Sequence, residues 1–226
     1  MVWGMLAIGH RGARGHEPEN TLRSIRRALE LGAGGVEIDV YFIDGQLVVF
    51  HDAKVDRTTN GHGRLARKSF GELRALDAGK GERIPTLREV FELVDRRALI
   101  HVELKGRGTV ESVAGLIREF VQQRGWRFSE FIVSSFHRTE LRALAGGEIP
   151  IGVLFKRSAR YFARVAKSLG AVAIHPNLRF VNRRLVERAH AAGLKVFVYT
   201  VNRPRDIARM KEFGVDGVFT DYPERV

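Results

Sequence analysis

Two histidines follow strongly apolar segments, in positions where they could move protons. AIGH ends on His10 and VVFH ends on His51. At neutral pH a histidine can both accept and donate a proton. A pair of them suits a displacement reaction in which one oxygen loses a proton and another gains one. By itself, a single histidine at a strand end is usually only a hydrogen-bonded side chain.

Three carboxylates stand in the same kind of apolar context. Glu37 and Asp39 are two residues apart in VEIDV, so on a strand both side chains face the same way, and Glu103 stands in IHVELK. Three hard oxygen donors without cysteine suit Mg²⁺, Ca²⁺ or Mn²⁺ better than Zn²⁺. A structural ion network with Arg11 and Lys105 is the competing interpretation, and the carboxylates alone do not separate the two.

Arg11 and Lys105 favour a site for phosphate. A guanidinium offers a planar fork to phosphate oxygens, and an ammonium offers a point charge. Together with the two histidines and the acidic triad, these cations indicate a metal-assisted phosphoryl site.

The elements that would position these residues alternate between helix and strand. ALELGAGGVEIDV and AHAAGLKVFVYT each show an apolar-periodic helix that ends near a glycine and is followed by a β-branched strand. Strands are predicted at 5–9, 35–41, 47–51, 98–104, 131–135, 150–155, 171–174, 195–201 and 215–220. Helices are predicted near 21–31, 86–95, 109–124, 138–145, 158–169, 182–192 and 204–213.

If 35–51 folds as one hairpin-like excursion, eight main strands remain, which is typical of a (β/α)8 TIM barrel that carries its site at the carboxyl ends of the strands. A doubly wound open sheet is the alternative. We expect one domain over 1–226 with an inserted loop region at about 53–85 after the second barrel strand. GHGRLA in that insertion resembles a nucleotide fingerprint only loosely, and a solvent-exposed turn is the expected structure there.

Six motifs occur in an order that resembles the glycerophosphodiester phosphodiesterase family: HRG at 10–12, PENT at 18–21, EIDV at 37–40, HD at 51–52, ELK at 103–105 and TDYP at 220–223. The resemblance implies a TIM barrel with a small insertion, one divalent cation with Mg²⁺ preferred over Ca²⁺ or Mn²⁺, and hydrolysis of diesters such as glycerophosphocholine or glycerophosphoethanolamine to glycerol 3-phosphate and an alcohol. It assigns catalysis to His10 and His51, of which we expect His10 to be the base and His51 the acid. It makes Glu37, Asp39 and Glu103 the metal ligands, and Arg11 and Lys105 the phosphate binders.

One position departs from the family pattern. Tyr199 precedes TVN where a tryptophan is common, so an aromatic pocket wall is kept but its size and polarity change. Phe136 resembles the second pocket aromatic. Glu19 and Asn20 are expected to brace the site. Asn20 or Thr21 can cap the first helix, with Asn20 favoured, and His101 is expected to be buried and hydrogen-bonded.

Composition limits the other possibilities. The chain has 226 residues, a formal charge of +12 and no cysteine, which excludes disulfides and thiolate sites. No transmembrane or signal segment is visible, so a cytoplasmic enzyme is expected, with no nucleic-acid partner and an oligomeric state that stays open. Two functional alternatives are a lysophospholipase D-like enzyme, which needs an apolar groove near the insertion, and a basic module that binds nucleic acid or a membrane surface.

Overall fold

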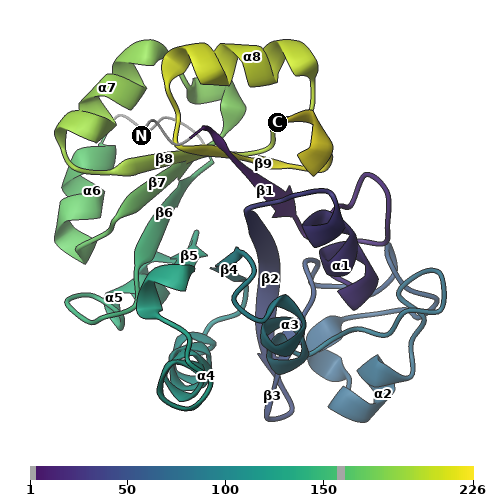
Figure 1. The fold of residues 1–226 in the computed structure, drawn as a ribbon. Helices are drawn as coiled ribbons and strands as arrows, with labels where there is room; N and C mark the ends of the chain where they lie inside the picture. The colour runs from purple at the N-terminus through teal and green to yellow at the C-terminus, as the bar shows by residue number, and fades with distance from the viewer. Residues whose placement is uncertain (1–3, 157–160) are drawn as a thin grey trace.

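The computed structural model describes residues 4–156 and 161–226, and at its centre eight parallel strands form a closed ring (Figure 1). Strand β1 pairs in parallel with β2 on one side and with β9 on the other, which closes the sheet. The predicted (β/α)8 barrel is therefore confirmed and the open sheet is excluded. The barrel strands are β1 (Leu6–His10), β2 (Gly35–Ile43), β4 (Leu99–Leu104), β5 (Phe131–Ser135), β6 (Ile151–Phe155), β7 (Ala173–Pro176), β8 (Lys195–Val198) and β9 (Gly217–Thr220).

Helices surround the barrel, and their ends follow the sequence signals. Helix α3 begins with a capping box between Thr86 and Glu89, and α8 begins at Pro204. Gly214 ends α8 with φ of 73°, which is the left-handed closure that the sequence predicts. The helices around the barrel are α1 (Leu22–Glu30), α3 (Leu87–Val94), α4 (Val110–Gln123), α5 (Arg138–Arg142), α6 (Phe162–Leu169), α7 (Arg183–Ala191) and α8 (Pro204–Phe213).

Most boundaries differ from the predicted ones by only a few residues. The helix predicted at 158–169 corresponds to α6 from Phe162 onward, and its first positions, 158–160, lie outside the described residues. Strand β8 ends at Val198, so Tyr199 lies just beyond the strand instead of inside it. None of the helices in the described part of the chain has the length and apolar character of a membrane span.

Strand β2 extends past the barrel and returns as β3 (Gln46–Val49). The two strands pair antiparallel, with Ile43 opposite Gln46, and the two linking residues, Asp44 and Gly45, have φ of 49° and 75°. Asp-Gly with positive φ at both positions is the favoured two-residue hairpin turn. The hairpin-like excursion at 35–51 is confirmed, and it directs the chain after β3 back toward the barrel mouth.

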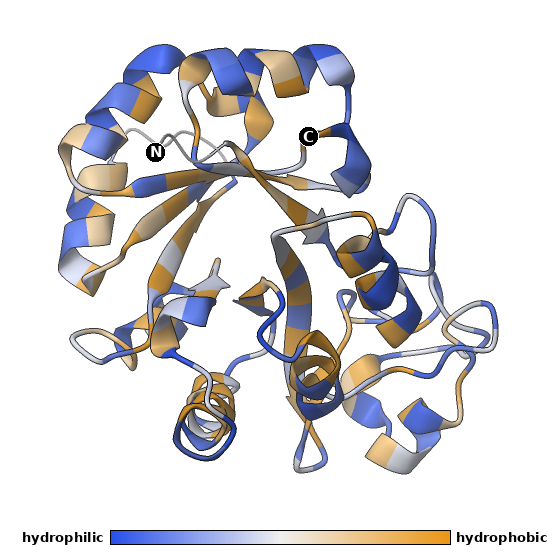
Figure 2. Ribbon diagram, in the orientation of Figure 1, coloured by the Kyte–Doolittle hydropathy of each residue, from blue (hydrophilic) through white to orange (hydrophobic). Residues whose placement is uncertain are grey.

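Apolar side chains lie both inside and outside the ring of strands. Figure 2 shows that the barrel strands are predominantly hydrophobic, while the helices carry hydrophilic residues on their outer sides. Ile8, Phe197 and Phe219 pack inside the barrel. A larger cluster, which includes Ile38, Phe91 and Ile117, lies between the strands and the helices. This packing on both faces is what a parallel sheet requires.

The inserted region at 53–85 packs beside the barrel around a small core of its own. It contains α2 (Phe70–Arg74), which begins with a capping box between Ser69 and Glu72, and the buried residues Leu65 and Leu73. Arg74 ties it to α3 through Glu89, with nitrogen–oxygen distances of 2.9 and 3.0 Å. In Figure 1 this region lies next to α1 and α3, near the mouth of the barrel.

Candidate active site

The chain bends sharply where β1 ends. Arg11 and Gly12 have φ of 56° and 80°. A Cβ on Gly12 would lie 2.5 Å from the carbonyl carbon of Ser24, so only glycine fits there. Because of this bend the backbone N–H of Arg11 donates to Glu37 Oε2 at 3.0 Å. The bend thus fixes the end of β1 to one of the predicted metal ligands on β2.

His10 is oriented by a carboxylate that directly follows the last barrel strand, β9. Its Nδ1 lies 2.8 Å from Asp221 Oδ1, and Asp221 also accepts from Asn202 Nδ2 at 2.7 Å and pairs with Arg14 Nε at 2.8 Å. We assign the proton to Nδ1, since the carboxylate can only accept it. Nε2 is then left as an acceptor. Burial lowers the pKa of His10, the hydrogen bond that Nδ1 donates to Asp221 opposes this, and the charges of Arg11 and Arg14 lower the pKa further, so the neutral ring is favoured at pH 7.

Three carboxylates meet inside the barrel mouth. Glu37, Asp39 and Glu103 each offer an oxygen, and these oxygens lie within 4.8 Å of one another. Asp39 and Glu103 stand opposite each other in the pairing of β2 with β4. Burial, followed by the charges of Asp39 and Glu103, raises the pKa of Glu37. Burial, followed by Asp39, also raises that of Glu103. Close carboxylates of this kind repel one another, so the arrangement suits a bound cation.

Cations and an amide surround this acidic triad. Lys105 Nζ lies 2.8 Å from Glu103 Oε1 and 3.6 Å from Asp39 Oδ1. Arg11 Nε lies 3.2 Å from Asp39 Oδ2, and the Asn20 amide donates to the same oxygen at 3.0 Å. The triad therefore has neighbours that hold its side chains in place, and Lys105 and Arg11 stay next to it with groups that can bind an anion.

His51 approaches the triad from the chain that follows β3. Phe50 N donates to the backbone oxygen of Asp39 at 2.9 Å, which fixes this segment above β2. The Nδ1 of His51 contacts Asp52, and Arg57 of the insertion donates to Asp52 Oδ2 at 2.7 Å. Burial is the largest cause of a lowered pKa at His51, although Asp39 and Asp52 oppose it. Like His10, His51 therefore has a carboxylate on Nδ1, and within the described part of the chain Nε2 of neither ring has a hydrogen-bond partner.

Arg57 also connects this histidine to the opposite side of the site. It donates to Glu19 Oε2 and Oε1 at 2.8 and 2.7 Å, and Glu19 in turn accepts from Arg11 at 2.6 Å. Burial raises the pKa of Glu19, but the bonds from Arg57 and Arg11 outweigh it and lower that pKa to about 2. A continuous series of ion pairs thus runs from His51 through Asp52, Arg57 and Glu19 to Arg11.

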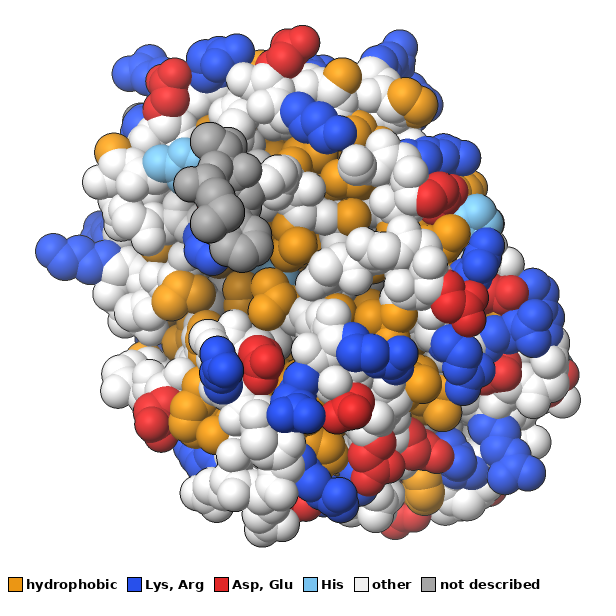
Figure 3. Space-filling model, viewed as in Figure 1, with side chains coloured by type: hydrophobic (Ala, Val, Ile, Leu, Met, Phe, Trp, Pro, Cys, Tyr) orange, Lys and Arg blue, Asp and Glu red, His pale blue; other side chains and the backbone are white. Residues whose placement is uncertain are grey.

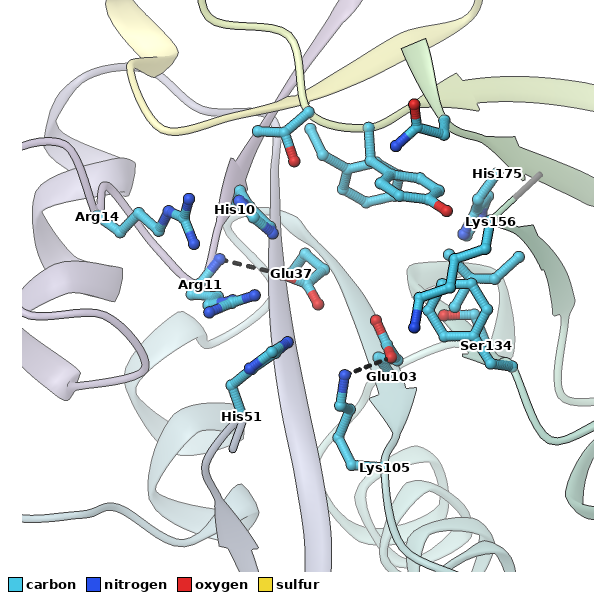
Figure 4. A pocket seen from close by; sticks show the side chains of 16 residues that line it. His10, Arg11, Arg14, Glu37, His51, Glu103, Lys105, Ser134, Lys156 and His175 are labelled. Atoms are coloured by element: carbon cyan, nitrogen blue, oxygen red, sulfur yellow. Dashed lines mark hydrogen bonds and ion pairs between the residues drawn. The ribbon is translucent and has the colours of Figure 1, made fainter. Parts of the chain in front are cut away.

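A cavity of about 430 Å³ opens at the barrel mouth (Figure 4). In Figure 4, His10, Arg11, Arg14 and His51 lie on one side of it, Glu37 and Glu103 near its centre, and Lys156, Ser134 and His175 on the opposite side. Of the predicted site residues, the following line this cavity: His10, Arg11, Glu37, His51, Glu103, Lys105, Phe136 and Tyr199. The other predicted site residues lie behind the cavity wall and contact the residues that line it; they are Asp39, Glu19 and Asn20. The chain thus gathers all the predicted side chains in one place.

Two expectations about single residues are wrong. Thr21, not Asn20, caps α1, since the Thr21 side chain accepts from Ser24 N; Asn20 has φ of 57° and instead holds Asp39. His101 is fully buried, but among the described residues neither of its ring nitrogens has a hydrogen-bond partner. Its neighbours are the aromatic rings of Phe197 and Phe219 and the imidazole of His175, so the barrel interior gives it contacts but no acceptor.

Sequence reasoning missed several side chains that belong to the site. Asp221 stands in the TDYP motif and follows an apolar strand, so the rule that selected His10 could have selected it as well. Lys156 follows β6 in the same way. Arg57 lies within the insertion, 38 residues from Glu19 in sequence. No periodicity or strand-end position marks it, and only the folded structure brings it to the site.

The comparisons with known proteins agree with this geometry. A family model described as the glycerophosphoryl diester phosphodiesterase family matches residues 10–225. A glycerophosphodiester phosphodiesterase of Caldanaerobacter subterraneus subsp. tengcongensis is 40% identical over 97% of this chain and 95% of its own length. One from Bacillus altitudinis is 35% identical over 96% of this chain and 95% of its own length. A solved phosphodiesterase of Oleispira antarctica, in complex with the product sn-glycerol-3-phosphate, superposes with a TM-score of 0.86 at 31% identity, covering 97% of this chain and 94% of that one.

Proposed function

The chain belongs to the glycerophosphoryl diester phosphodiesterase family and is a phosphoric diester hydrolase, and on this premise we propose how its own residues carry out the reaction. The substrate is a glycerophosphodiester, and the products are glycerol 3-phosphate and an alcohol. The observation that carries the proposal is a single cavity in which two carboxylate-bound histidines flank a buried acidic triad and two cations.

The acidic triad fits a divalent cation. Three hard oxygen donors lie close enough to share one ion. Burial, followed by the charges of neighbouring carboxylates, raises the pKa of Glu37 and of Glu103, and a cation would relieve that repulsion. Glu37, Asp39 and Glu103 would hold it, with Mg²⁺ preferred and Ca²⁺ or Mn²⁺ as alternatives. When bound, such an ion withdraws charge from a non-bridging phosphate oxygen.

Arg11 and Lys105 bind the phosphate. Both line the cavity, and both are held next to the triad by ion pairs. Burial opposes the charge of Lys105, but Glu103 and Asp39 outweigh it and raise the pKa of this ammonium, so it stays charged at neutral pH. Two fixed positive groups at the phosphate stabilise the extra charge that develops in the transition state.

His10 acts as base and His51 as acid. His10 Nε2 accepts the proton of the attacking oxygen as that oxygen bonds to phosphorus. His51 starts in its protonated form, with Nδ1 donating to Asp52, and gives the proton on Nε2 to the alcohol oxygen as the bond from that oxygen to phosphorus breaks. The deeper burial of His10 and its two neighbouring arginines support the neutral form that a base needs. His51 has an exposed fraction of 30%, against 13% for His10, so it can exchange protons with solvent more readily. The attacking oxygen belongs either to water or to the glycerol 2-hydroxyl, which would first form a cyclic phosphate.

The whole chain, 1–226, serves as one phosphodiesterase domain in this proposal. The inserted region at about 53–85 contributes Arg57, which holds Asp52 and thereby His51. A cytoplasmic location, with lipid-derived glycerophosphodiesters as metabolic substrates, completes the proposal; a chain without cysteine has no disulfide that would call for an oxidising compartment.

The alternatives find less support. A lysolipid-cleaving variant needs an apolar groove near the insertion, whereas the cavity against the insertion is lined mainly by polar and charged residues, among them Arg14, Glu19 and Arg57.

A nucleic-acid or membrane-surface module needs clustered cations. On the face in Figure 3, blue and red side chains are intermixed.

The test is release of glycerol 3-phosphate from a glycerophosphodiester after EDTA treatment and after addition of Mg²⁺, Ca²⁺ or Mn²⁺. We expect metal to restore turnover in the wild type and not in the E37A/D39A variant.

At saturating metal, His10→Ala and His51→Ala should each lower kcat by at least about 10²-fold. His190→Ala is the matched control, because His190 lies on α7 and pairs with Asp216 outside the cavity. A near-normal kcat for either active-site variant would remove that histidine from the mechanism.

A further inference from the structure

The side of the cavity opposite the two histidines presents a lysine whose charge is not neutralised. Lys156 directly follows β6, and Figure 4 shows its side chain reaching into the cavity from the side opposite His51. Among the described residues no carboxylate pairs with Lys156. The other cations that line the cavity each pair with one: Arg11, Arg14 and Lys105.

Lys156 also occupies an aromatic face. Its Nζ lies 5.2 Å from the ring centroid of Phe136, and Phe136 packs edge to face with Tyr199 at 6.3 Å. Aromatic faces are the surfaces that bind quaternary ammonium groups such as choline. Here the ammonium group of Lys156 already lies against the face of Phe136. A positively charged head group that entered this part of the cavity would meet a like charge.

The other polar groups on this side favour an anion as well. Asn177 lines the cavity, and its Oδ1 already accepts from Arg179 N at 3.0 Å, which leaves the NH₂ group to donate. The described lining residues that come from β5 to β9 and the loops after them include no aspartate or glutamate. This side therefore offers donors and positive charge.

We propose that Lys156 is a specificity-determining residue that favours glycerophosphodiesters whose alcohol carries a negative charge, such as a carboxylate, and that disfavours choline. The inference rests on the proposed function and narrows its substrate class. The phosphate itself is neutralised elsewhere, by Arg11 and Lys105, so the charge of Lys156 is left to act on the alcohol.

Simple electrostatics sets the size of the effect. Two unit charges about 6 Å apart at an effective dielectric constant of about 20 change a binding constant by about 100-fold. Lys156 is solvent-exposed, which weakens the interaction, and we expect a preference of about 10-fold in kcat/KM for the anionic over the cationic substrate.

The experiment compares three diesters of glycerol 3-phosphate, with choline, glycerol and 3-hydroxypropanoate as the alcohol. Their charges at the alcohol are positive, neutral and negative. Release of glycerol 3-phosphate is measured for the wild type, Lys156→Met, Lys156→Glu and the control Lys167→Met, which changes an exposed lysine of α6. We expect the wild type and K167M to favour the anionic diester, K156M to lose the preference and K156E to favour choline.

The outcomes separate the two proposals. If the wild type releases no glycerol 3-phosphate from any of the three with any metal, the proposed function fails. If it cleaves all three and K156M leaves their ratio unchanged, or lowers all three rates equally, the inference about Lys156 is overturned and the proposed function stands.

Discussion

Replacing the buried His175 should remove much of the protein's sensitivity to mild acid. His175 is 1% exposed and His101 is fully buried, and among the described residues none of their ring nitrogens has a hydrogen-bond partner. The two rings lie 5.5 Å apart, and each packs edge to face against Phe197 and Phe219. Among the described residues no carboxylate or hydrogen-bond acceptor stabilises a positive charge on His175. Burial, and next the charge of His101, lowers the pKa of His175 well below 6.5.

The sign and the size of the effect follow from this shift. An unfolded chain protonates His175 near pH 6.5, whereas the folded chain keeps it neutral to a much lower pH. The unfolded state therefore binds more protons below pH 6.5, so stability is fully present above that pH and falls as the pH drops. One such group removes about 1.4 kcal/mol per pH unit once the pH is well below 6.5, or about 2 kcal/mol between pH 6.5 and 4.5.

Urea unfolding of the wild type and His175→Leu at pH 6.5 and 4.5, both in EDTA, measures this contribution. The difference in unfolding free energy between the two proteins should shift by about 2 kcal/mol in favour of H175L at the lower pH. His62→Leu is the control, since the His62 side chain is 87% exposed, and its pH dependence should follow the wild type. The carboxylates titrate alike in both proteins, so the comparison cancels them. A difference that stays constant with pH would refute the view that His175 is held neutral in an apolar interior.

The remaining predictions concern the site and its support. Asp221→Asn should lower kcat on the order of 10²-fold and move the acidic limb of the kcat/KM profile to lower pH, because the carboxylate raises the pKa of His10; an unmoved limb would contradict this. Arg57→Met should lower kcat by about 10-fold with little change in KM, since Asp52 and with it His51 lose their arginine partner, whereas Arg11 keeps its ion pairs with Glu19 and Asp39; an unchanged kcat would argue against a positioning role. Glu37→Gln should raise the metal-free Tm and abolish the rise in Tm on adding Mg²⁺, and a retained rise would place the ion elsewhere. Gly152→Ala puts a Cβ 2.5 Å from His175 Cε1 and should cost roughly 1–3 kcal/mol, much of it recovered when His175→Ala is added; strict additivity of the two changes would show that the rings do not clash.

The sequence predicts the barrel well because the rule it uses is local. Several helices carry their own end signals and the barrel strands carry apolar runs, as in Thr86 and Glu89 at the start of α3 and Gly214 at the end of α8. The site follows from the same rule: a polar residue that ends an apolar strand faces the barrel mouth, and this selects His10, Glu103 and Lys105. His51 follows β3, which is not a barrel strand, but the two-residue turn at Asp44 and Gly45 returns this segment to the mouth.

The other site residues are brought together by contacts between positions far apart in the sequence, and no local pattern indicates such contacts. His10 and Asp221 are 211 residues apart, and Arg57 and Glu19 are 38 apart. Asn20 appears in sequence as a helix cap because caps and carboxylate donors use the same side-chain chemistry, and only its φ of 57° and its bond to Asp39 distinguish them.

The cationic side chains that line the cavity are of two kinds, which differ in whether a carboxylate pairs with them. The sequence alone does not distinguish the two kinds. Arg11 and Lys105 each form an ion pair with a carboxylate of the acidic triad. These ion pairs neutralise part of the positive charge, and the remainder acts on a ligand bound beside the triad. Lys156 has no carboxylate partner in the described part of the chain. Its charge therefore acts on the part of a ligand that lies next to Phe136. In the proposed mechanism the first pair therefore supports a step common to all phosphodiesters, whereas the proposed role of Lys156 is to distinguish one diester from another. Substitutions should follow the same division: a change at Lys105 should lower the rate for every substrate, and a change at Lys156 should alter the order in which substrates are preferred.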